Sequence, residues 1–183
     1  MRIISGTARG RRLLAPRTRS IRPTADRVRE SIFNVLGQTL NGQDVLDLFA
    51  GTGALALEAL SRGAAKAVLV DRDREAVRLC EANARMLGFG DRVRVLSAPV
   101  EQAIKRLERG GERFDLIFAD PPYAARVVPQ IVGTLGAAGL LNPGAIACIE
   151  HDKREIVPSN SGRLAKVDER RFGDSVVSIY RVP

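Results

Sequence analysis

Short apolar runs bounded by glycine or aspartate recur along the chain and alternate with longer segments of helical spacing. The runs, each typical of a buried strand, cover residues 44–49, 67–70, 93–96, 114–119 and 145–149. The helical segments between and after them cover residues 54–62, 74–87, 100–109 and 126–135. This alternation predicts βαβ units, and therefore a parallel sheet with helices on both faces.

The two ends of the chain depart from this alternation. Residues 163–171 and 175–181 have strand character, and only Phe172-Gly173-Asp174 joins them. Three residues cannot hold a crossover helix, so these strands should pair antiparallel. Residues 2–5 and 11–14 flank Gly6 and Gly10 and can form a small hairpin. The pattern thus predicts an α/β fold whose mostly parallel sheet ends in a C-terminal antiparallel hairpin, with a small N-terminal hairpin as an extension.

An amphipathic helix is expected after the N-terminal extension. Thr24 can cap it, and Asp26 would lie in its first turn. One apolar stripe is expected to be buried, formed by Val28, Ile32, Val35 and Leu36. No repeat or low-complexity segment is present, and the only hinge candidate is residues 16–23. We therefore divide the chain into an extension, residues 1–22, and one globular domain, residues 23–183.

Composition supports one globular domain, because 45% of the 183 residues are hydrophobic and 27% are charged. Two cysteines and one histidine are too few for a four-coordinate zinc site or a disulfide framework, so we expect no metal and a reducing compartment. No run of 18 apolar residues occurs, and the N-terminus lacks a signal-peptide core. We expect a cytoplasmic protein that does not bind a membrane, and a monomer.

Charge is the informative part of the composition. The formal net charge is +8, and residues 1–30 contain nine arginines against two acidic residues. A basic arm on a nearly neutral body indicates a polyanionic partner, and arginine favours bidentate phosphate contacts. A solubilising tail is the alternative. The expected RNA-binding residues are Arg2, Arg9, Arg11, Arg12 and Arg22. Truncation should then separate binding by the arm from the activity of the body.

A glycine turn between the first strand and its helix indicates an adenosine cofactor. Gly51-Thr52-Gly53 lets the backbone approach a ligand, and Asp71 closes the next strand, where it can accept hydrogen bonds from ribose hydroxyls. The loop also fits the dinucleotide fingerprint. Asp47 favours S-adenosylmethionine over NAD, because an acid at the end of the first strand can meet an ammonium group but would repel a pyrophosphate. A tight turn with a local capping acid is the structural alternative.

The strongest signal in the sequence is Asp120-Pro121-Pro122-Tyr123, directly after the strand 114–119. Two prolines stiffen the loop, and a nearby carbonyl stays available to a ligand. The carboxyl end of a central strand opens on the same crevice as the glycine loop. Asp120 and a carbonyl near Pro121 can each accept a hydrogen from an amine conjugated to a base, and Tyr123 can stack on the extruded base. A proline turn with a capping acid and a core tyrosine is the alternative.

These motifs resemble the class I S-adenosylmethionine-dependent amino-methyltransferases, and more narrowly the bacterial RsmD family of 16S rRNA guanine-N2 methyltransferases. The resemblance extends over nearly the whole chain. It includes the segments 2–6, 22–30, 57–64 and 172–174 in addition to the glycine loop and Asp120-Pro121-Pro122-Tyr123.

The resemblance implies a Rossmann-like, seven-stranded class I methyltransferase sheet and methylation of the N2 amine of guanine 966 in 16S rRNA, on the 30S subunit or an assembly intermediate. It places the cofactor against the loop 47–53, Asp71 and the end of the third strand. Many relatives carry an acid there, whereas this chain has Ser97 and Ala98, which can take the adenine contact. The expected cofactor-binding residues are Asp47, Phe49, Ala50, Gly51, Thr52, Gly53, Asp71, Arg72, Ser97 and Ala98.

Other function classes stay open at this point. An adenine or cytosine amino-methyltransferase acting on DNA or another RNA is the enzymatic alternative, although the chain has no room for a separate major-groove reader. A binding module that has lost catalysis is the other. Five further residues have a plain structural interpretation beside a functional one: His151, Glu58, Phe172, Cys80 and Cys148. We expect His151 to be a solvated loop residue and both cysteines to pack as small hydrophobes.

Overall fold

The computed structural model describes residues 1–16, 26–122 and 127–183. Within these residues the helices are α1 (Asp26–Leu36), α2 (Ala54–Ser61), α3 (Arg74–Leu87), α4 (Val100–Arg109), α5 (Val128–Ala137) and the single 3₁₀ turn η1 (Gly90–Arg92). The strands are β1 (Asp44–Leu48), β2 (Lys66–Asp71), β3 (Val93–Ser97), β4 (Phe114–Ala119), β5 (Leu141–Asp152), β6 (Asn160–Ser161), β7 (Leu164–Phe172) and β8 (Ser175–Arg181).

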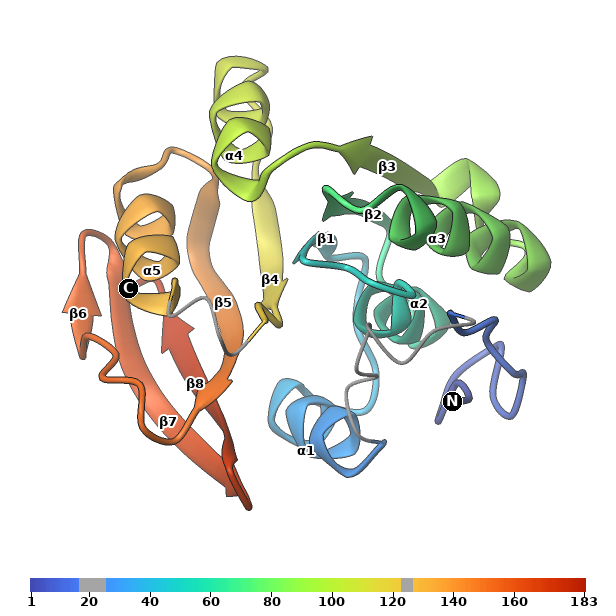
Figure 1. The fold of residues 1–183 in the computed structure, drawn as a ribbon, viewed down its shortest axis with the longest axis horizontal. Helices are drawn as coiled ribbons and strands as arrows, with labels where there is room; N and C mark the ends of the chain where they lie inside the picture. Colours follow the sequence, from blue (N-terminus) through green and yellow to red (C-terminus); the bar gives the residue numbers. More distant parts are fainter. Residues whose placement is uncertain (17–25, 123–126) are drawn as a thin grey trace.

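All eight strands form one sheet in the order β3-β2-β1-β4-β5-β8-β7-β6 (Figure 1). The first five strands along the chain pair in parallel, and β8 pairs antiparallel with both β5 and β7. The predicted α/β class and the C-terminal hairpin are therefore confirmed. The two-residue β6 adds a strand to the seven that the family resemblance implies, and β5 is longer than the predicted run 145–149 because it pairs with β8 as far as Asp152.

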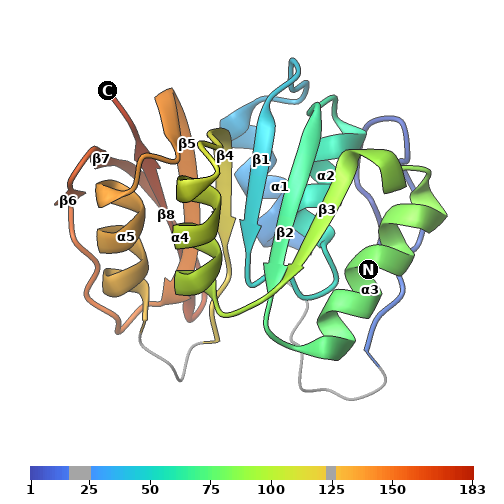
Figure 2. The ribbon, with the colours of Figure 1, turned by 90° about the horizontal axis from the view of Figure 1, so that it is seen from above.

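Alternating strand residues contribute to two separate cores, one on each face of the sheet. In β4, Phe118 packs with α1, α2 and α3, whereas Ile117 packs with α4 and α5. Figure 2 shows α4 and α5 in front of the sheet and α1 behind it. Because strands buried on both faces need continuous apolar runs, this arrangement explains the pattern along the sequence.

Helix α1 buries a stripe that differs from the predicted one. Val28 and Ile32 are buried as expected, but Val35 is exposed, and Arg29 and Phe33 are buried instead. Phe33 stacks obliquely on Phe118 at 5.8 Å between ring centroids, so the larger aromatic residue determines which face turns inward. The expected cap, Thr24, lies outside the described residues.

The N-terminal segment forms a hairpin with an antiparallel bridge between Arg2 and Arg12, and further backbone hydrogen bonds cross it, such as that from Ile3 N to the Arg11 carbonyl at 3.0 Å. Its apolar residues Ile3, Ala8 and Leu13 are buried in the same core as α1 and α2. Deleting the segment would therefore expose the core of the body. The binding role predicted for it must be separated from catalysis by surface substitution rather than by truncation.

Two buried side chains fasten this hairpin to the body. The Glu58 carboxylate in α2 accepts hydrogen bonds from the backbone N–H groups of Ile4 and Ser5, at 2.7 and 2.9 Å. Asn83 in α3 exchanges hydrogen bonds with the backbone of Leu14 and also donates to the carbonyl of Thr52, at 2.9 Å. One amide thus joins the hairpin to the glycine loop.

None of the helices within the described part of the chain is long and apolar enough to span a membrane.

Candidate active site

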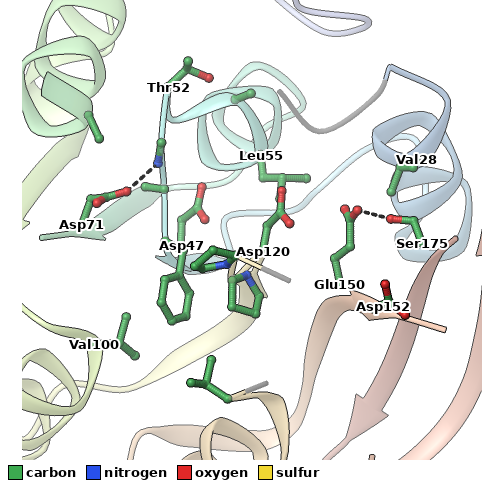
Figure 3. Close-up of a pocket in the computed structure, with 18 of the residues that line it drawn as sticks. Val28, Asp47, Thr52, Leu55, Asp71, Val100, Asp120, Glu150, Asp152 and Ser175 are labelled. Atoms are coloured by element: carbon green, nitrogen blue, oxygen red, sulfur yellow. Dashed lines mark hydrogen bonds between the residues drawn. The ribbon is translucent and has the colours of Figure 1, made fainter. Parts of the chain in front are cut away.

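A cleft of about 1190 Å³ lies at the carboxyl ends of the parallel strands. The loops after β1, β2, β3 and β4 line one part of it, and the end of β5 and the β7–β8 turn line the other (Figure 3). In open α/β sheets this edge is where ligands bind. Residues predicted to bind a cofactor that also line this cleft are Asp47, Phe49, Ala50, Gly51, Thr52, Asp71 and Arg72.

The glycine loop turns through three left-handed residues in five positions. Phe49 has φ 64°, Gly51 has φ 57° and Gly53 has φ 78°. A left-handed conformation is costly for a phenylalanine, and such strain is typical of functional loops. Gly53 is the N-cap of α2, and a Cβ there would lie 2.9 Å from Cδ2 of Leu69. Gly53 therefore shapes the loop from behind and does not line the cleft.

Asp71 lies beside the glycine loop and accepts hydrogen bonds from two backbone N–H groups. Its Oδ2 accepts a hydrogen bond from Gly51 N at 2.9 Å, and its Oδ1 accepts one from Asp73 N at 2.9 Å (Figure 3). The side chain lines the cleft and is half-buried. A carboxylate oxygen has two lone pairs, so each oxygen can accept a further hydrogen bond from a ligand hydroxyl.

Asp47 is the most buried acid in the described part of the cleft, with 2% of the residue exposed. Its Oδ2 accepts a hydrogen bond from Ala56 N in α2 at 3.1 Å. The pKa of this carboxyl is raised to about 8, chiefly by burial; the hydrogen bond from Ala56 lowers the pKa, and the nearby acids Asp120 and Asp71 raise it. A buried carboxyl with a raised pKa is suited to receive a cationic group, which would restore its charge.

Asp120, Pro121 and Pro122 follow β4 directly and line the cleft. Asp120 is half-buried, and its backbone N–H is directed to the Leu48 carbonyl of β1 at 3.4 Å. Figure 3 shows its carboxylate between those of Asp47 and Glu150. The predicted stacking residue Tyr123 lies outside the described residues. The structure therefore brings Asp120 and the glycine loop to one cleft, as the sequence predicts.

After β3, the residues that line the cleft differ from the two that were predicted. Ser97 and Ala98 are not among the described residues that line the cleft, whereas the next three, Pro99, Val100 and Glu101, line it. Ala98 N donates to the Asp71 carbonyl at 3.1 Å, so this peptide is used within the fold. Glu101, in the first turn of α4 and four positions after Ser97, is an acid that lines the cleft.

A second wall of the cleft was missed from the sequence except for Phe172, for which a place at the substrate rim was one of two interpretations. Glu150 and Asp152 line it from β5, Ser175 lines it from β8, and Phe172 lines it from the end of β7. The hairpin prediction places Phe172 at a turn, but only the β5–β8 pairing brings that turn to the cleft. The break of the apolar run at Glu150 was the available signal. The Arg154 guanidinium donates two hydrogen bonds to the Asp152 carboxylate and holds the pKa of that carboxyl well below its usual range.

Four of the five ambiguous residues are buried within the fold. Glu58 also pairs with Arg62 at 2.8 Å and is not among the described residues that line the cleft, so it satisfies buried polar groups. His151 is buried in β5 rather than solvated in a loop, because its Nε2 lies 2.9 Å from Ser178 Oγ across the sheet. Cys80 and Cys148 are buried, and burial raises the pKa of each thiol.

The expected RNA-binding residues Arg2, Arg9, Arg11 and Arg12 are all exposed on the N-terminal hairpin. Arg11 donates to the Met86 carbonyl of α3, which holds its side chain to the body. Arg22 lies outside the described residues. The basic surface predicted from the sequence therefore lies on a hairpin that is bound to helices α2 and α3.

Known proteins are similar to this chain in both fold and sequence. The Escherichia coli protein named "Ribosomal RNA small subunit methyltransferase D" is 34% identical over 99% of this chain and 89% of its own length. A conserved hypothetical protein of Streptococcus pyogenes superposes with a TM-score of 0.79 at 39% identity, over 85% of this chain and 96% of its own. A hypothetical protein of Thermus thermophilus gives a TM-score of 0.83 at 36% identity, over 98% of both chains.

The family described as "Conserved hypothetical protein 95" matches residues 1–181. This match includes the N-terminal hairpin, the glycine loop and the C-terminal hairpin. It agrees with the class I methyltransferase fold and with the motifs around the cleft. The chain therefore belongs to this family, the RsmD family that its motifs resemble.

Proposed function

We propose that this protein is an S-adenosylmethionine-dependent methyltransferase that modifies an exocyclic base amine of ribosomal RNA. The observation that carries the proposal is the meeting of Asp120 and the glycine loop in one cleft. An acid followed by two prolines at the end of β4 provides acceptors for an amine, and the loop after β1 provides a cofactor site. The name of the Escherichia coli relative, a ribosomal RNA small subunit methyltransferase, supports the class of substrate.

The residues of the cleft suit S-adenosylmethionine better than a dinucleotide. Asp47 is buried where an ammonium group would favour the ionised carboxylate and pair with it, whereas a pyrophosphate there would be repelled by that carboxylate in a low-dielectric pocket. Asp71 can accept hydrogen bonds from the ribose hydroxyls. The adenine can lie against Pro99, Val100 and Glu101. When bound, the cofactor supplies an electrophilic methyl group. The protein's task is then to orient the nucleophile.

Asp120 and the carbonyls beside Pro121 orient that nucleophile. The lone pair of an amine attached to a purine is delocalised into the ring, so the amine attacks poorly on its own. Two acceptors that each take one amine hydrogen would hold the nitrogen with its lone pair toward the methyl carbon. Asp120 can also accept the proton that the nitrogen loses once it is methylated. Tyr123 would stack on the extruded base, an interaction of about 1–3 kcal/mol.

We further propose that the amine is N2 of guanine, with guanine 966 of 16S rRNA in the 30S subunit or an assembly intermediate as the target. The family resemblance supports this finer assignment. The exposed arginines of the N-terminal hairpin would hold the RNA backbone, and the extruded base would enter between Asp120 and the β7–β8 turn.

A methylation assay with labelled S-adenosylmethionine tests the proposal. The substrates are naked 16S rRNA, 30S particles and duplex DNA, followed by mapping of the modified base. We expect label on a guanine of the RNA or the particle, and none on DNA. Asp120→Ala should abolish transfer while S-adenosylhomocysteine binds within a few fold of the unmodified protein. Label on DNA adenine or cytosine would establish the alternative enzyme, and an absence of transfer to every substrate would leave only a binding module.

A further inference from the structure

A buried carboxylate beside Asp120 is not used in the chemistry above. Ile149 of β5 pairs with Ala119 of β4, so Glu150 and Asp120 continue adjacent parallel strands at the same level. Neighbouring strands lie about 4.8 Å apart. Glu150 is 7% exposed and lines the cleft. In Figure 3 the acids Asp47, Asp120 and Glu150 follow one another across the site, with Glu150 on the side away from the glycine loop.

The position of the Glu150 side chain is fixed from β8. Ser175 Oγ donates a hydrogen bond to Glu150 Oε1 (Figure 3). Ser175 and Phe172, at the two ends of the β7–β8 turn, line the same part of the cleft. A carboxylate offers about four acceptor sites, so Glu150 can accept a hydrogen bond from a ligand in addition to the one from Ser175, and a deprotonated carboxylate can only accept hydrogen bonds. Glu150 is thus a positioned acceptor next to the expected amine site.

The four RNA bases differ in what they would present to such an acceptor. Guanine has a ring N1–H donor beside its amino group. Adenine and cytosine have a ring nitrogen lone pair beside theirs, and uracil has no amino group. With the amine held at Asp120, the neighbouring carboxylate would meet a donor in guanine and a repelling lone pair in adenine or cytosine. Sites built for a hydrogen bond reject analogues that cannot make it, because buried polar groups are then left without partners.

We propose that Glu150, held by Ser175, reads the ring N1–H of the target base and thereby selects guanine. This inference rests on the proposed function and deepens it. Asp120 acts on the amine, and Glu150 reads the neighbouring ring nitrogen. Guanine specificity then depends on the pairing of β4 with β5, which places the two acids side by side.

The test compares RNA that carries guanine at the target position with RNA that carries 2-aminopurine there. This analogue keeps the amine at C2, but its ring N1 is an acceptor. The unmodified protein should prefer guanine. Glu150→Gln, whose amide can donate to an acceptor, should lower the kcat/KM preference for guanine over 2-aminopurine by about tenfold or more. Taking the ratio for each variant cancels the intrinsic difference between the two amines.

Two further variants make the result specific. Ser175→Ala keeps the carboxylate but removes its anchor, so it should lower the preference by a smaller factor, and it gives the same readout if Glu150→Gln loses stability. Glu75→Gln alters an exposed carboxylate of α3 outside the cleft lining and should leave the preference unchanged. An unchanged preference in both cleft variants would overturn the role of Glu150. Methylation of a base other than guanine by the unmodified protein would overturn the proposed function itself.

Discussion

At the scale of single residues, the cleft combines acids that must differ in their tasks. Asp47 is buried and receives one backbone hydrogen bond, Asp71 supports two backbone groups, and Asp120 lies half-buried at the end of β4. Their environments separate them: burial dominates the pKa of Asp47, which rises to about 8 from an ordinary 3.8. Asp47 should therefore leave a signature in the pH dependence of stability.

Without a bound cofactor, the folded protein keeps the proton of Asp47 to higher pH than the unfolded chain does. The stability that this proton contributes is complete below pH 4 and is lost as the pH rises to about 8. Asp47→Asn removes the titration. The Tm of the unmodified protein should therefore fall relative to that of Asp47→Asn between pH 5 and pH 8. The expected change is about 2–4 °C for each kcal/mol of unfolding free energy that is lost. Thermal melts across this range test the expectation, and parallel Tm curves would contradict it.

A bound cationic ligand should oppose the loss of stability that Asp47 causes as the pH rises. The ammonium group of S-adenosylhomocysteine would favour the ionised form of Asp47, so ligand binding should release a proton near pH 7. The stabilisation by this ligand should be largely lost in Asp47→Asn.

At the scale of elements, the junction between β1 and α2 determines the shape of the cofactor loop. Gly53, the N-cap of α2, has φ 78°, and a Cβ there would lie 2.9 Å from Leu69 Cδ2 and 3.3 Å from Leu57 Cδ1. A side chain at this position therefore meets both backbone strain and a filled core. The loop and the helix behind it are a single packed unit.

Gly53→Ala should destabilise the protein by about 1–3 kcal/mol and weaken S-adenosylhomocysteine binding, because the loop must shift away from the core. Gly111→Ala is the matched control. Gly111 also has a positive φ, 69°, but no atom lies within 4 Å of its would-be Cβ, in a turn that does not line the cleft. Melting curves and ligand titrations of both variants test this. Equal losses in ligand binding would show that packing behind the loop is irrelevant.

The sequence predicts elements whose pattern is local, and it misses contacts that depend on strand pairing. The strand 114–119 and the helix 74–87 have the predicted bounds because their apolar runs end at turns and caps. The role of Glu150 in the cleft depends instead on β5 lying between β4 and β8. Val35 was misplaced because two positions of α1 could face the core, and Phe33 filled the space beside Phe118.

At the scale of the whole molecule, part of the excess positive charge of residues 1–30 lies on the exposed side of the N-terminal hairpin. The basic hairpin packs on α2 and α3, and Asn83 joins it to the glycine loop through hydrogen bonds to Leu14 and Thr52. The surface proposed to bind RNA and the loop proposed to bind the cofactor are therefore joined through one buried side chain. Removing residues 1–20 would remove Ile3 and Leu13 from the core, so a loss of activity after truncation would not identify the RNA-binding surface.

Charge substitutions on the exposed side of the hairpin isolate the electrostatic contribution. Arg9 and Arg12 are exposed, and both contribute to the hairpin through their backbones: Arg9 N donates to the Gly6 carbonyl at 3.2 Å, and Arg12 forms the bridge with Arg2. The double substitution Arg9→Gln and Arg12→Gln should therefore keep the fold and weaken RNA binding. Each phosphate contact that is lost should reduce the slope of log affinity against log salt by about 0.7–0.9. S-adenosylhomocysteine binding should not change.

Arg106→Gln is the control for this experiment, because Arg106 is an exposed arginine on α4, across the sheet from the hairpin. Both proteins lose positive charge, so a general effect of net charge would appear in both. A smaller salt slope only in the hairpin variant would place the phosphate contacts on residues 1–16. If the hairpin variant keeps the full slope, its arginines serve solubility, and the RNA must bind through the arginines that surround the cleft, such as Arg72 and Arg171.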